Sequence, residues 1–293
     1  QYQSFYFISL QIYIKILDVH ELSQITEPLL HTLINHLKLS ALSSVQEEIL
    51  QAIGCLIQCA PQQLISANIS SFMPCVIECL TNSAETSLCA AATAVLGDVC
   101  SACGKLISPF AQNIMNYVLK HLASEVDDLI LKIQLLSLCE DVALALGIDF
   151  RIFLSDTLGV LQNFSSISPF VDDDADADYI ELVDEIKHIS LDTYTSIIQG
   201  MYSNNTIDNI DIQIWTSHIS YALQLIDSIA KDPNHSDSAA CSSCGLIGDL
   251  VNTFKPNINT PAIRNLVDEA TRSTASKTKN IGIWLKRVME TTH

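Results

Sequence analysis

Two pairs of cysteines have the spacing found in zinc sites, Cys100-x2-Cys103 and Cys241-x2-Cys244. A structural zinc ion needs four ligands that converge on the metal, with thiolate sulfurs about 2.3 Å away. Both pairs lie in segments with a helical apolar pattern, they are far apart in the chain, and neither has a histidine pair nearby at finger spacing. Small buried residues between packed helices explain them better, because cysteine is among the most buried residue types. The sequence therefore predicts no metal and no cofactor.

An acidic cluster occupies one polar stretch and consists of Asp172, Asp173, Asp174, Asp176 and Asp178. Pro169 and the absence of an apolar period predict a loop here. An EF-hand calcium loop does not fit, since counting from Asp172 its glycine position holds Ala177 and its final glutamate position holds Val183. Two interpretations stay open, a solvated acidic loop and a contact for a basic peptide.

No catalytic arrangement can be recognised among the remaining polar residues. The P-loop, dinucleotide-binding, zinc-protease and nucleophile-elbow motifs are all missing from the sequence. The histidines are scattered, and none stands beside a plausible nucleophile and an orienting carboxylate. The clustered aspartates would be solvated, whereas hydrolysis by a carboxylate pair needs a sheltered cleft. The sequence predicts that this protein is not an enzyme.

Trp284 is one of only two tryptophans. It shares a helical face with Ile281, Leu285 and Val288, so it could be a core residue that covers the end of a helical stack. It could also be an exposed anchor for a partner, because tryptophan is enriched among interface hot spots and its ring attracts cations. The sequence leaves both interpretations open.

The elements that position these residues are predicted to be helices. Apolar residues make up 48% of the 293 residues, aromatics only 6%, and the nine glycines and eight prolines are too few for a turn-rich β architecture. Three similar segments begin at Ala52, Val95 and Leu138, so each follows the one before by 43 residues. Repeats of two helices with a period of about 40–47 residues are typical of HEAT and armadillo solenoids. Such a solenoid presents an extended surface, which favours protein binding over catalysis.

The apolar periodicity predicts six helix pairs and a terminal helix. The expected ranges are 3–17 with 21–39, 45–60 with 69–81, 85–103 with 108–122, 129–146 with 149–164, 179–202 with 211–230, 237–254 with 260–272, and 276–290. Residues 1–164 therefore form about four pairs, 165–178 an acidic interrupting loop, and 179–293 the C-terminal repeats with the last helix. The fold class is all-α, a right-handed superhelix of antiparallel helix pairs.

The net charge of −18 limits the kind of partner. Residues 255–293 contain seven Lys/Arg and three Asp/Glu, a local balance of +4, so the rest of the chain carries −22. An acidic body of this kind repels nucleic acid and anionic membranes and favours basic partners. Ten cysteines within apolar helices indicate a reducing compartment rather than a disulfide framework. The first apolar run is too short for a membrane span, and a chain that starts at Gln1 is expected to be a fragment cut within a helix of an earlier repeat.

Several segments resemble the importin-β family of nuclear import receptors, in order and over essentially the whole chain. They are Val95–Asp98, Asp141–Gly147, Tyr194–Gly200, Ile226–Ala230, Gly245–Leu250, and Arg272-Ser273 followed by Lys277 and Lys279 before Trp284. The chain looks like the C-terminal third of such a receptor. The resemblance implies a HEAT superhelix with the first helix of each pair outside and the second inside. It also implies cytoplasmic and nuclear localisation, including the nuclear pore and envelope.

The resemblance further implies the partners. The C-terminal arch of these receptors surrounds the basic importin-β-binding helix of importin-α, and similar basic cargo signals would use the same acidic inner surface. Phenylalanine-glycine nucleoporins and the GTPase Ran bind the full receptor, with the main Ran site in repeats that this chain lacks. Charge-assisted hydrogen bonds to a basic helix are expected from residues of the predicted inner helices, with an aromatic contact: Asp156, Asp227, Asp268, Glu269 and Trp284. No nucleic acid and no membrane insertion is expected.

Two other classes of protein compete with this interpretation. A non-catalytic HEAT scaffold, such as a phosphatase regulatory subunit, would have regular repeats without the acidic interruption and no preference for arginine-rich helices. An enzyme that uses cysteines or carboxylates would need a cleft with one unusually reactive thiol or an acid pair. The third helix pair also departs from the family, since its second helix carries Gln112, Asn113, Lys120 and His121 where the family often has acids.

Overall fold

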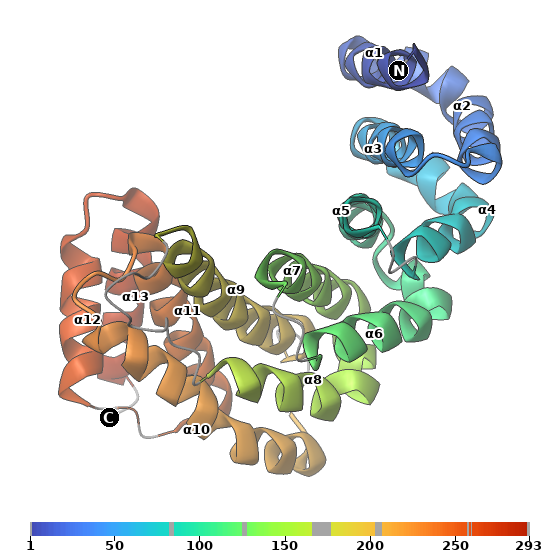
Figure 1. Cartoon of the computed structure of the whole chain (residues 1–293). Helices are drawn as coiled ribbons and strands as arrows, with labels where there is room; N and C mark the ends of the chain where they lie inside the picture. The colour runs from blue at the N-terminus through green and yellow to red at the C-terminus, as the bar shows by residue number, and fades with distance from the viewer. Residues whose placement is uncertain are drawn as a thin grey trace. The chain divides into compact units, whose positions relative to one another are not determined.

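The computed structural model describes residues 2–81, 85–124, 128–165, 177–202, 207–256, 258 and 260–291, and every regular element in these ranges is a helix (Figure 1). Within each of the chain's two compact parts the helices alternate between two layers, which confirms the predicted all-α solenoid of HEAT type. The chain divides into two compact units. The N-terminal unit comprises Gln1–His121 with Ser137–Leu146, and the C-terminal unit comprises Leu122–Leu136 with Gly147–His293.

The N-terminal unit contains the first six α-helices. Their bounds are α1 (Tyr2–Ile16), α2 (Val19–Leu39), α3 (Ser43–Cys59), α4 (Gln62–Thr81), α5 (Thr86–Cys103) and α6 (Ser108–Leu122), with the 3-10 turn η1 (Gly104–Ile107) before α6. Helix α7 (Leu129–Leu146) contributes its second half to this unit and its first half to the other. Helix α4 begins at Gln62, well before the predicted start at residue 69. The sequence analysis missed its first turns, because polar and apolar residues alternate there too irregularly to give a clear helical period.

The C-terminal unit contains six further helices. They are α8 (Arg151–Phe164), α9 (Ala177–Tyr202), α10 (Asn209–Lys231), α11 (Asp237–Phe254), α12 (Pro261–Arg272) and α13 (Ser276–Thr291), with the 3-10 turn η2 (Gly147–Phe150) before α8. The predicted interrupting loop 165–178 extends two residues too far, because α9 begins at Ala177. Asp178 therefore lies in the first turn of α9. An acidic residue is stabilising there because the helix N-terminus carries a partial positive charge.

Local sequence signals account for most helix ends. Asp18 caps α2 through a capping box with Glu21, in which the Glu21 backbone N–H donates to the Asp18 carboxylate at 2.8 Å. Gly104 ends α5 with φ 52°, and Gly147 has φ 60° immediately after α7, a conformation that costs glycine least. Thr260 caps α12, with Pro261 in the first turn.

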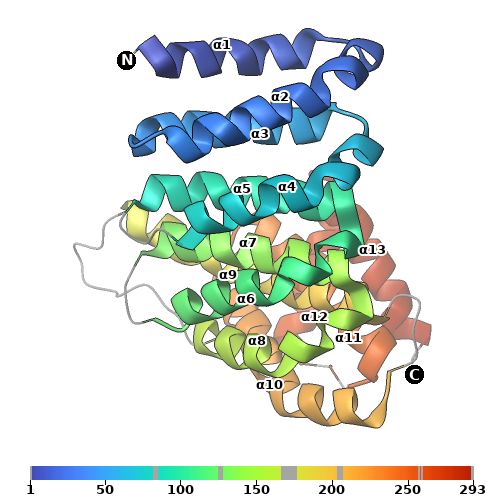
Figure 2. The ribbon, with the colours of Figure 1, turned by 90° about the vertical axis from the view of Figure 1, so that its right-hand side faces the viewer.

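Each layer is built from every second helix. In the N-terminal unit α1, α3 and α5 lie side by side, with α2 and α4 in the other layer (Figure 2). Helix α2 packs closely on α3 and α4 on α5, whereas α4 has little contact with α3. The consecutive helices that pack most closely are therefore α2 with α3 and α4 with α5. The sequence analysis had instead paired α1 with α2 and α3 with α4. Pro28 lies within α2 and Pro74 within α4, and each proline removes one backbone hydrogen-bond donor from its helix.

The C-terminal unit repeats this arrangement. Helices α9, α11 and α13 form one layer, α8, α10 and α12 form the other, and α12 packs more extensively on α13 than on α11. The largest core side chain is Trp215 on α10, which is fully buried. Its ring lies 5.0 Å from that of Phe254, centroid to centroid, and its Nε1–H donates to the hydroxyl of Tyr202 at 3.2 Å. These contacts join α9, α10 and α11.

Two stretches of the N-terminal unit, Gln62–Thr81 and Thr86–Leu122, are long and apolar enough to cross a membrane by composition alone. In the folded structure, 44% of the most apolar segment of the first stretch is buried. For the second stretch the buried share is 50%. Packing between neighbouring helices accounts for their hydropathy, since a helix in a stacked solenoid buries its apolar side on the repeats around it.

A series of carboxylates placed over glycines connects α3, α5 and α7, and we call it the carboxylate ladder. A Cβ added at Gly54 would come within 3.1 Å of Asp98 Oδ2, and one added at Gly97 within 2.5 Å of Asp141 Oδ2. Asp98 also accepts hydrogen bonds from the Gln58 side chain at 2.9 and 3.0 Å. Burial raises the pKa of Asp98, and burial together with the charge of Asp98 raises the pKa of Asp141. The 43-residue sequence repeat thus reflects a repeated contact between helices.

The ladder predicts how the stability of the N-terminal unit depends on pH. A carboxyl group whose pKa is higher in the folded state than in the unfolded chain favours folding at acidic pH, and this contribution is lost as the pH rises through the folded value. We therefore expect Asp141→Asn to raise the free energy of unfolding at pH 7.5 and to reduce the gain in stability on going from pH 7.5 toward pH 5. Denaturant titrations at several pH values measure both effects. Glu27→Gln, at an exposed position on α2, is the control, and an equal effect of both variants would contradict the prediction.

Candidate binding surface

Four of the five residues predicted to bind a partner lie on one layer of the C-terminal unit. Asp156 is on α8, Asp227 on α10, and Asp268 and Glu269 are neighbours on α12. The fifth, Trp284, is on α13 and belongs to the other layer. The structure therefore brings the four acids onto neighbouring helices of one layer and places Trp284 on a helix of the other layer. Because α12 packs more extensively on α13 than on α11, Asp268 and Glu269 lie on the first helix of that pair, whereas the sequence analysis had placed them on a second helix.

Three of these four acids already have a basic partner within the chain. Lys231 Nζ lies 2.5 Å from Asp227 Oδ2, Lys286 Nζ lies 3.2 Å from Asp268 Oδ1, and His235 Nε2 lies 3.4 Å from Glu269 Oε1. Asp156 is exposed and has no ion pair among the described residues. A basic ligand would thus meet one free carboxylate and three that are partly neutralised.

Trp284 covers a glycine of the neighbouring helix. A Cβ added at Gly248 on α11 would overlap the outer ring atoms of the Trp284 indole. The side chain is nevertheless 38% exposed. One part of the Trp284 ring therefore packs on α11, and the rest of the ring is exposed.

Of the acidic cluster 172–178, only Asp178 can be placed. Asp172, Asp173, Asp174 and Asp176 lie outside the described residues. Asp178 is exposed in the first turn of α9.

An acidic stripe on α9 was missed by the sequence analysis. Asp178, Glu181, Glu185, His188 and Asp192 are spaced by three or four residues and so lie along one side of the helix. The first three are exposed. His188 lies between two of the acids, with its Nδ1 3.6 Å from Glu185 Oε2 and its Nε2 3.3 Å from Asp192 Oδ2. The spacing of these residues could have revealed the stripe, but they also fit a solvated helix face.

The next helix of the same layer adds one more carboxylate. Asp249 on α11 accepts a hydrogen bond from the Gln199 side chain of α9 at 2.9 Å, and burial raises its pKa. Asp249 follows Gly248, the residue beneath Trp284. The stripe, Asp249 and Trp284 therefore lie on α9, α11 and α13, three successive helices of one layer.

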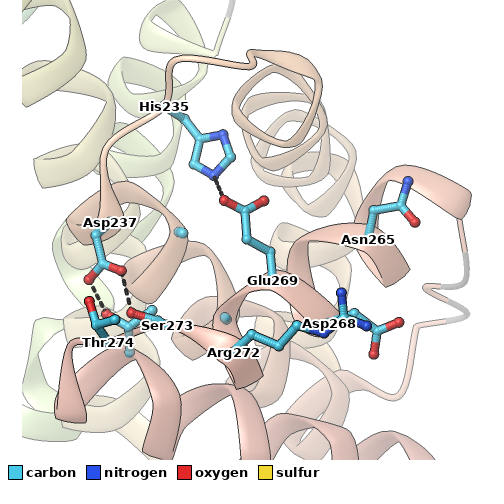
Figure 3. A pocket seen from close by; sticks show the side chains of 11 residues that line it. His235, Asp237, Asn265, Asp268, Glu269, Arg272, Ser273 and Thr274 are labelled. Atoms are coloured by element: carbon cyan, nitrogen blue, oxygen red, sulfur yellow. Dashed lines mark hydrogen bonds and ion pairs between the residues drawn. The ribbon is translucent and has the colours of Figure 1, made fainter.

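An open polar pocket of about 740 Å³ lies beside α12, at the start of α11 and around the turn between α12 and α13 (Figure 3). Two of the predicted residues, Asp268 and Glu269, line it together with His235, Asp237, Arg272 and Thr278. Asp237 accepts hydrogen bonds from the hydroxyls of Ser273, at 2.7 Å, and Thr278. These two hydrogen bonds lower the pKa of Asp237. They fix the start of α11 to the turn before α13, so one wall of the pocket is held in place.

Figure 3 shows the imidazole of His235 pointing at the carboxylate of Glu269. The other ring nitrogen, Nδ1, lies 2.6 Å from the backbone carbonyl oxygen of Asp232. Both ring nitrogens thus face oxygen acceptors, an arrangement that the protonated imidazolium satisfies with two N–H donors. His235 therefore acts as the counter-ion of Glu269 when it carries a proton.

The four cysteines with zinc-site spacing are buried. Cys100, Cys103, Cys241 and Cys244 are free thiols, as are the other six cysteines. Burial raises the pKa of Cys79 to about 11 and that of Cys244 to about 12, so these thiols are poor nucleophiles at neutral pH. Among the residues that the structure describes, no group of three or more His, Cys, Asp or Glu side chains is placed to hold a metal ion.

The fold and the acidic surface define a class of protein, the α-solenoids that bind other proteins along a row of helices. Residues 2–275 match the family model described as importin subunit beta-1-like, TPR repeats, and the chain belongs to this family of nuclear transport receptors. It is 30% identical over 212 residues to importin subunit beta-1 of Schizosaccharomyces pombe and 28% identical over 220 residues to that of Arabidopsis thaliana, which is 72% and 74% of this chain.

A solved structure of importin beta, crystallised in an ammonium sulfate condition, superposes with a TM-score of 0.86 at 25% identity and covers 99% of this chain. The match covers 33% of that structure's chain, and the two curated relatives are matched over 24% of their length. The matches thus span about a quarter to a third of the length of these relatives.

Proposed function

We propose that this chain is the part of a nuclear transport receptor that binds a basic helix, such as the importin-β-binding helix of importin-α or a similar cargo signal. The observation that carries the proposal is the acidic stripe on α9, followed in the same layer by Asp249 and the half-accessible ring of Trp284. Between Asp178 and Asp192 the chain has five acidic residues and one lysine. A cationic helix placed across this face would meet carboxylates first and an aromatic ring further on.

The physical role of each group follows from its exposure. Exposed ion pairs contribute little singly, so affinity depends on several carboxylates that act together and on the indole. Arginine would be favoured over lysine, because its planar guanidinium both pairs with carboxylates and stacks on an indole. Asp156, Asp227, Asp268 and Glu269 remain proposed contacts on the other layer. We expect them to matter less than the stripe, since three of the four have partners within the chain.

The role is that of a binding protein rather than an enzyme, and the wider assembly follows from the family. We propose that the full receptor moves between cytoplasm and nucleus, binds phenylalanine-glycine nucleoporins and is unloaded by Ran. A non-catalytic scaffold remains the competing function. It differs in having no preference for arginine-rich helices.

Isothermal titration calorimetry with a synthetic arginine-rich helix tests the proposal. We expect binding that weakens with salt, a loss of about tenfold in affinity for Trp284→Ala, and a similar loss for the double variant Glu181→Gln/Glu185→Gln. Asp156→Asn/Asp227→Asn removes the same amount of charge from the other layer and is the matched control. A folded protein that does not bind the helix would favour the scaffold. Larger losses in the control than in the stripe variant would move the site to the α8–α10–α12 layer.

A further inference from the structure

The indole of Trp284 occupies space that exists only because residue 248 is a glycine. A Cβ added at Gly248 would overlap Cζ3 and Cη2 of the indole and would lie 3.2 Å from its Cε3. These three atoms belong to the six-membered ring, so this part of the indole rests on α11. Any other residue at position 248 would therefore force either the ring or the two helices to move.

The backbones of α11 and α13 have little freedom to separate. Helix α11 packs between α9 and α13. Helix α13 also approaches α12 closely at Gly282, where an added Cβ would come within 2.9 Å of the carbonyl carbon of Ala270. Leu285, the residue after Trp284, is fully buried. Crowding at position 248 would therefore be relieved by rotation of the Trp284 side chain, because this residue is 38% exposed.

The same kind of contact occurs twice in the carboxylate ladder of the N-terminal unit. Asp98 of α5 lies over Gly54 of α3, and Asp141 of α7 lies over Gly97 of α5. In each case a glycine of one helix receives a side chain from the helix two places later in the chain. Trp284 over Gly248 is the aromatic counterpart of these carboxylates. The glycine thus determines where the side chain of the later helix lies, whatever the type of that side chain.

We propose that Gly248 is a positioning residue for partner binding, which holds the Trp284 indole in one orientation before the partner arrives. This inference rests on the proposed function, because the partner is taken to be a basic helix. The six-membered ring lies against α11, and the rest of the indole stays open to a cationic side chain. A ring that is already held in place loses little conformational freedom on binding, so more of its contact energy contributes to affinity.

The first test is calorimetry of Gly248→Ala with the same arginine-rich peptide. We expect the affinity to fall about three- to fivefold, less than for Trp284→Ala, because the ring is displaced but still present. The denaturant midpoint should stay the same or rise slightly, since alanine favours the helix and the ring can rotate away. Gly245→Ala is the matched control on α11, because a Cβ there would meet no atom of the described residues within 4 Å. It should change the affinity less than twofold.

The second test observes the ring itself. The chain has two tryptophans, so the ¹H–¹⁵N NMR spectrum contains two indole N–H signals, and Trp284→Phe identifies one of them by removing it. We expect Gly248→Ala to shift the Trp284 signal and to leave the signal of Trp215 in place. Gly245→Ala should leave both signals in place. A lower denaturant midpoint of Gly248→Ala with an unmoved Trp284 signal would mean that the helices separate instead, and the inference would be wrong.

The third test asks whether Gly248 acts through the indole. In a Trp284→Ala background, Gly248→Ala should change the affinity less than twofold, because no ring remains to be displaced. An equal loss with and without the indole would show that Gly248 acts through α11 and would overturn the inference. A shifted Trp284 signal with unchanged affinity would also overturn it, and both results leave the proposed function intact. If the folded parent protein does not bind the peptide, the proposed function fails and the inference fails with it.

Discussion

Replacing Asp211 by alanine is expected to lower the free energy of unfolding of the C-terminal unit by about 3 kcal/mol. The Asp211 side chain is fully buried, and its Oδ2 accepts a hydrogen bond from the Arg151 guanidinium at 2.7 Å. The variant leaves a polar cavity beside Tyr202, and it leaves Arg151 with Asp208 as its remaining carboxylate partner at 2.7 Å. Breaking a buried ion pair costs about 3–5 kcal/mol, and the low end applies because Arg151 is itself 39% exposed.

Hydrogen exchange of α8 and α10 combined with denaturant unfolding measures this loss. Asp208→Asn is the matched control. It removes a charge from the same arginine but is 41% exposed and keeps an oxygen that can cap α10. We expect it to cost under about 1 kcal/mol. A second comparison is Arg151→Met/Asp211→Leu, which should recover most of the loss because it leaves no unpaired charge. The explanation fails if Asp208→Asn is as damaging as Asp211→Ala.

Replacing Gly282 by alanine is expected to destabilise the packing of α13 on α12 by about 2 kcal/mol. The added Cβ would come within 2.8 Å of the backbone nitrogen of Thr271 and 2.9 Å of the carbonyl carbon of Ala270. Backbone atoms cannot rotate away as a side chain can, so the two helices must separate. Overpacking costs about 1–3 kcal/mol, and the better helix propensity of alanine offsets up to about 1 kcal/mol of it.

Two other helical glycines serve as controls for this prediction. A Cβ at Gly159 on α8 or at Gly245 on α11 would meet no atom within 4 Å. Alanine at either position should therefore be neutral or stabilising by up to about 1 kcal/mol. Denaturant midpoints of the three variants, with hydrogen exchange of α12 and α13, separate the effect of crowding from the effect of propensity. Stabilisation by alanine at all three positions would contradict the close approach at Gly282.

Helix positions could be predicted from the sequence because their signals are local. The apolar periods of α2 and α5, the glycine after α5 and the glycine after α7 all act within one or two helical turns. The pairing of helices could not be predicted in the same way. The period of 43 residues is the same whichever helix is taken as the first of a pair, so the sequence does not show which helices form a pair. The contacts of α4 with α5 and of α12 with α13 show this pairing.

The binding surface was less predictable for a related reason. The choice of Asp156, Asp227, Asp268 and Glu269 depended on the assumed pairing, and the partners of these residues depend on neighbouring elements. Lys286 is 18 residues from Asp268, and Arg151 is 60 residues from Asp211. No spacing rule connects side chains across such distances. The α9 stripe, in contrast, follows from spacing alone and was available in the sequence.

The contact of Trp284 with Gly248 has a further use, because the chain has only two indoles and they lie in different surroundings. Trp215 is enclosed by Tyr202 and Phe254, and Trp284 is partly in contact with water. Their fluorescence should differ, with blue-shifted emission from the first and emission at longer wavelength from the second. A Trp215→Phe variant would leave one intrinsic fluorophore at the junction of α11 and α13. Its intensity and quenching would report directly on whether this junction opens, closes or is covered when another molecule approaches.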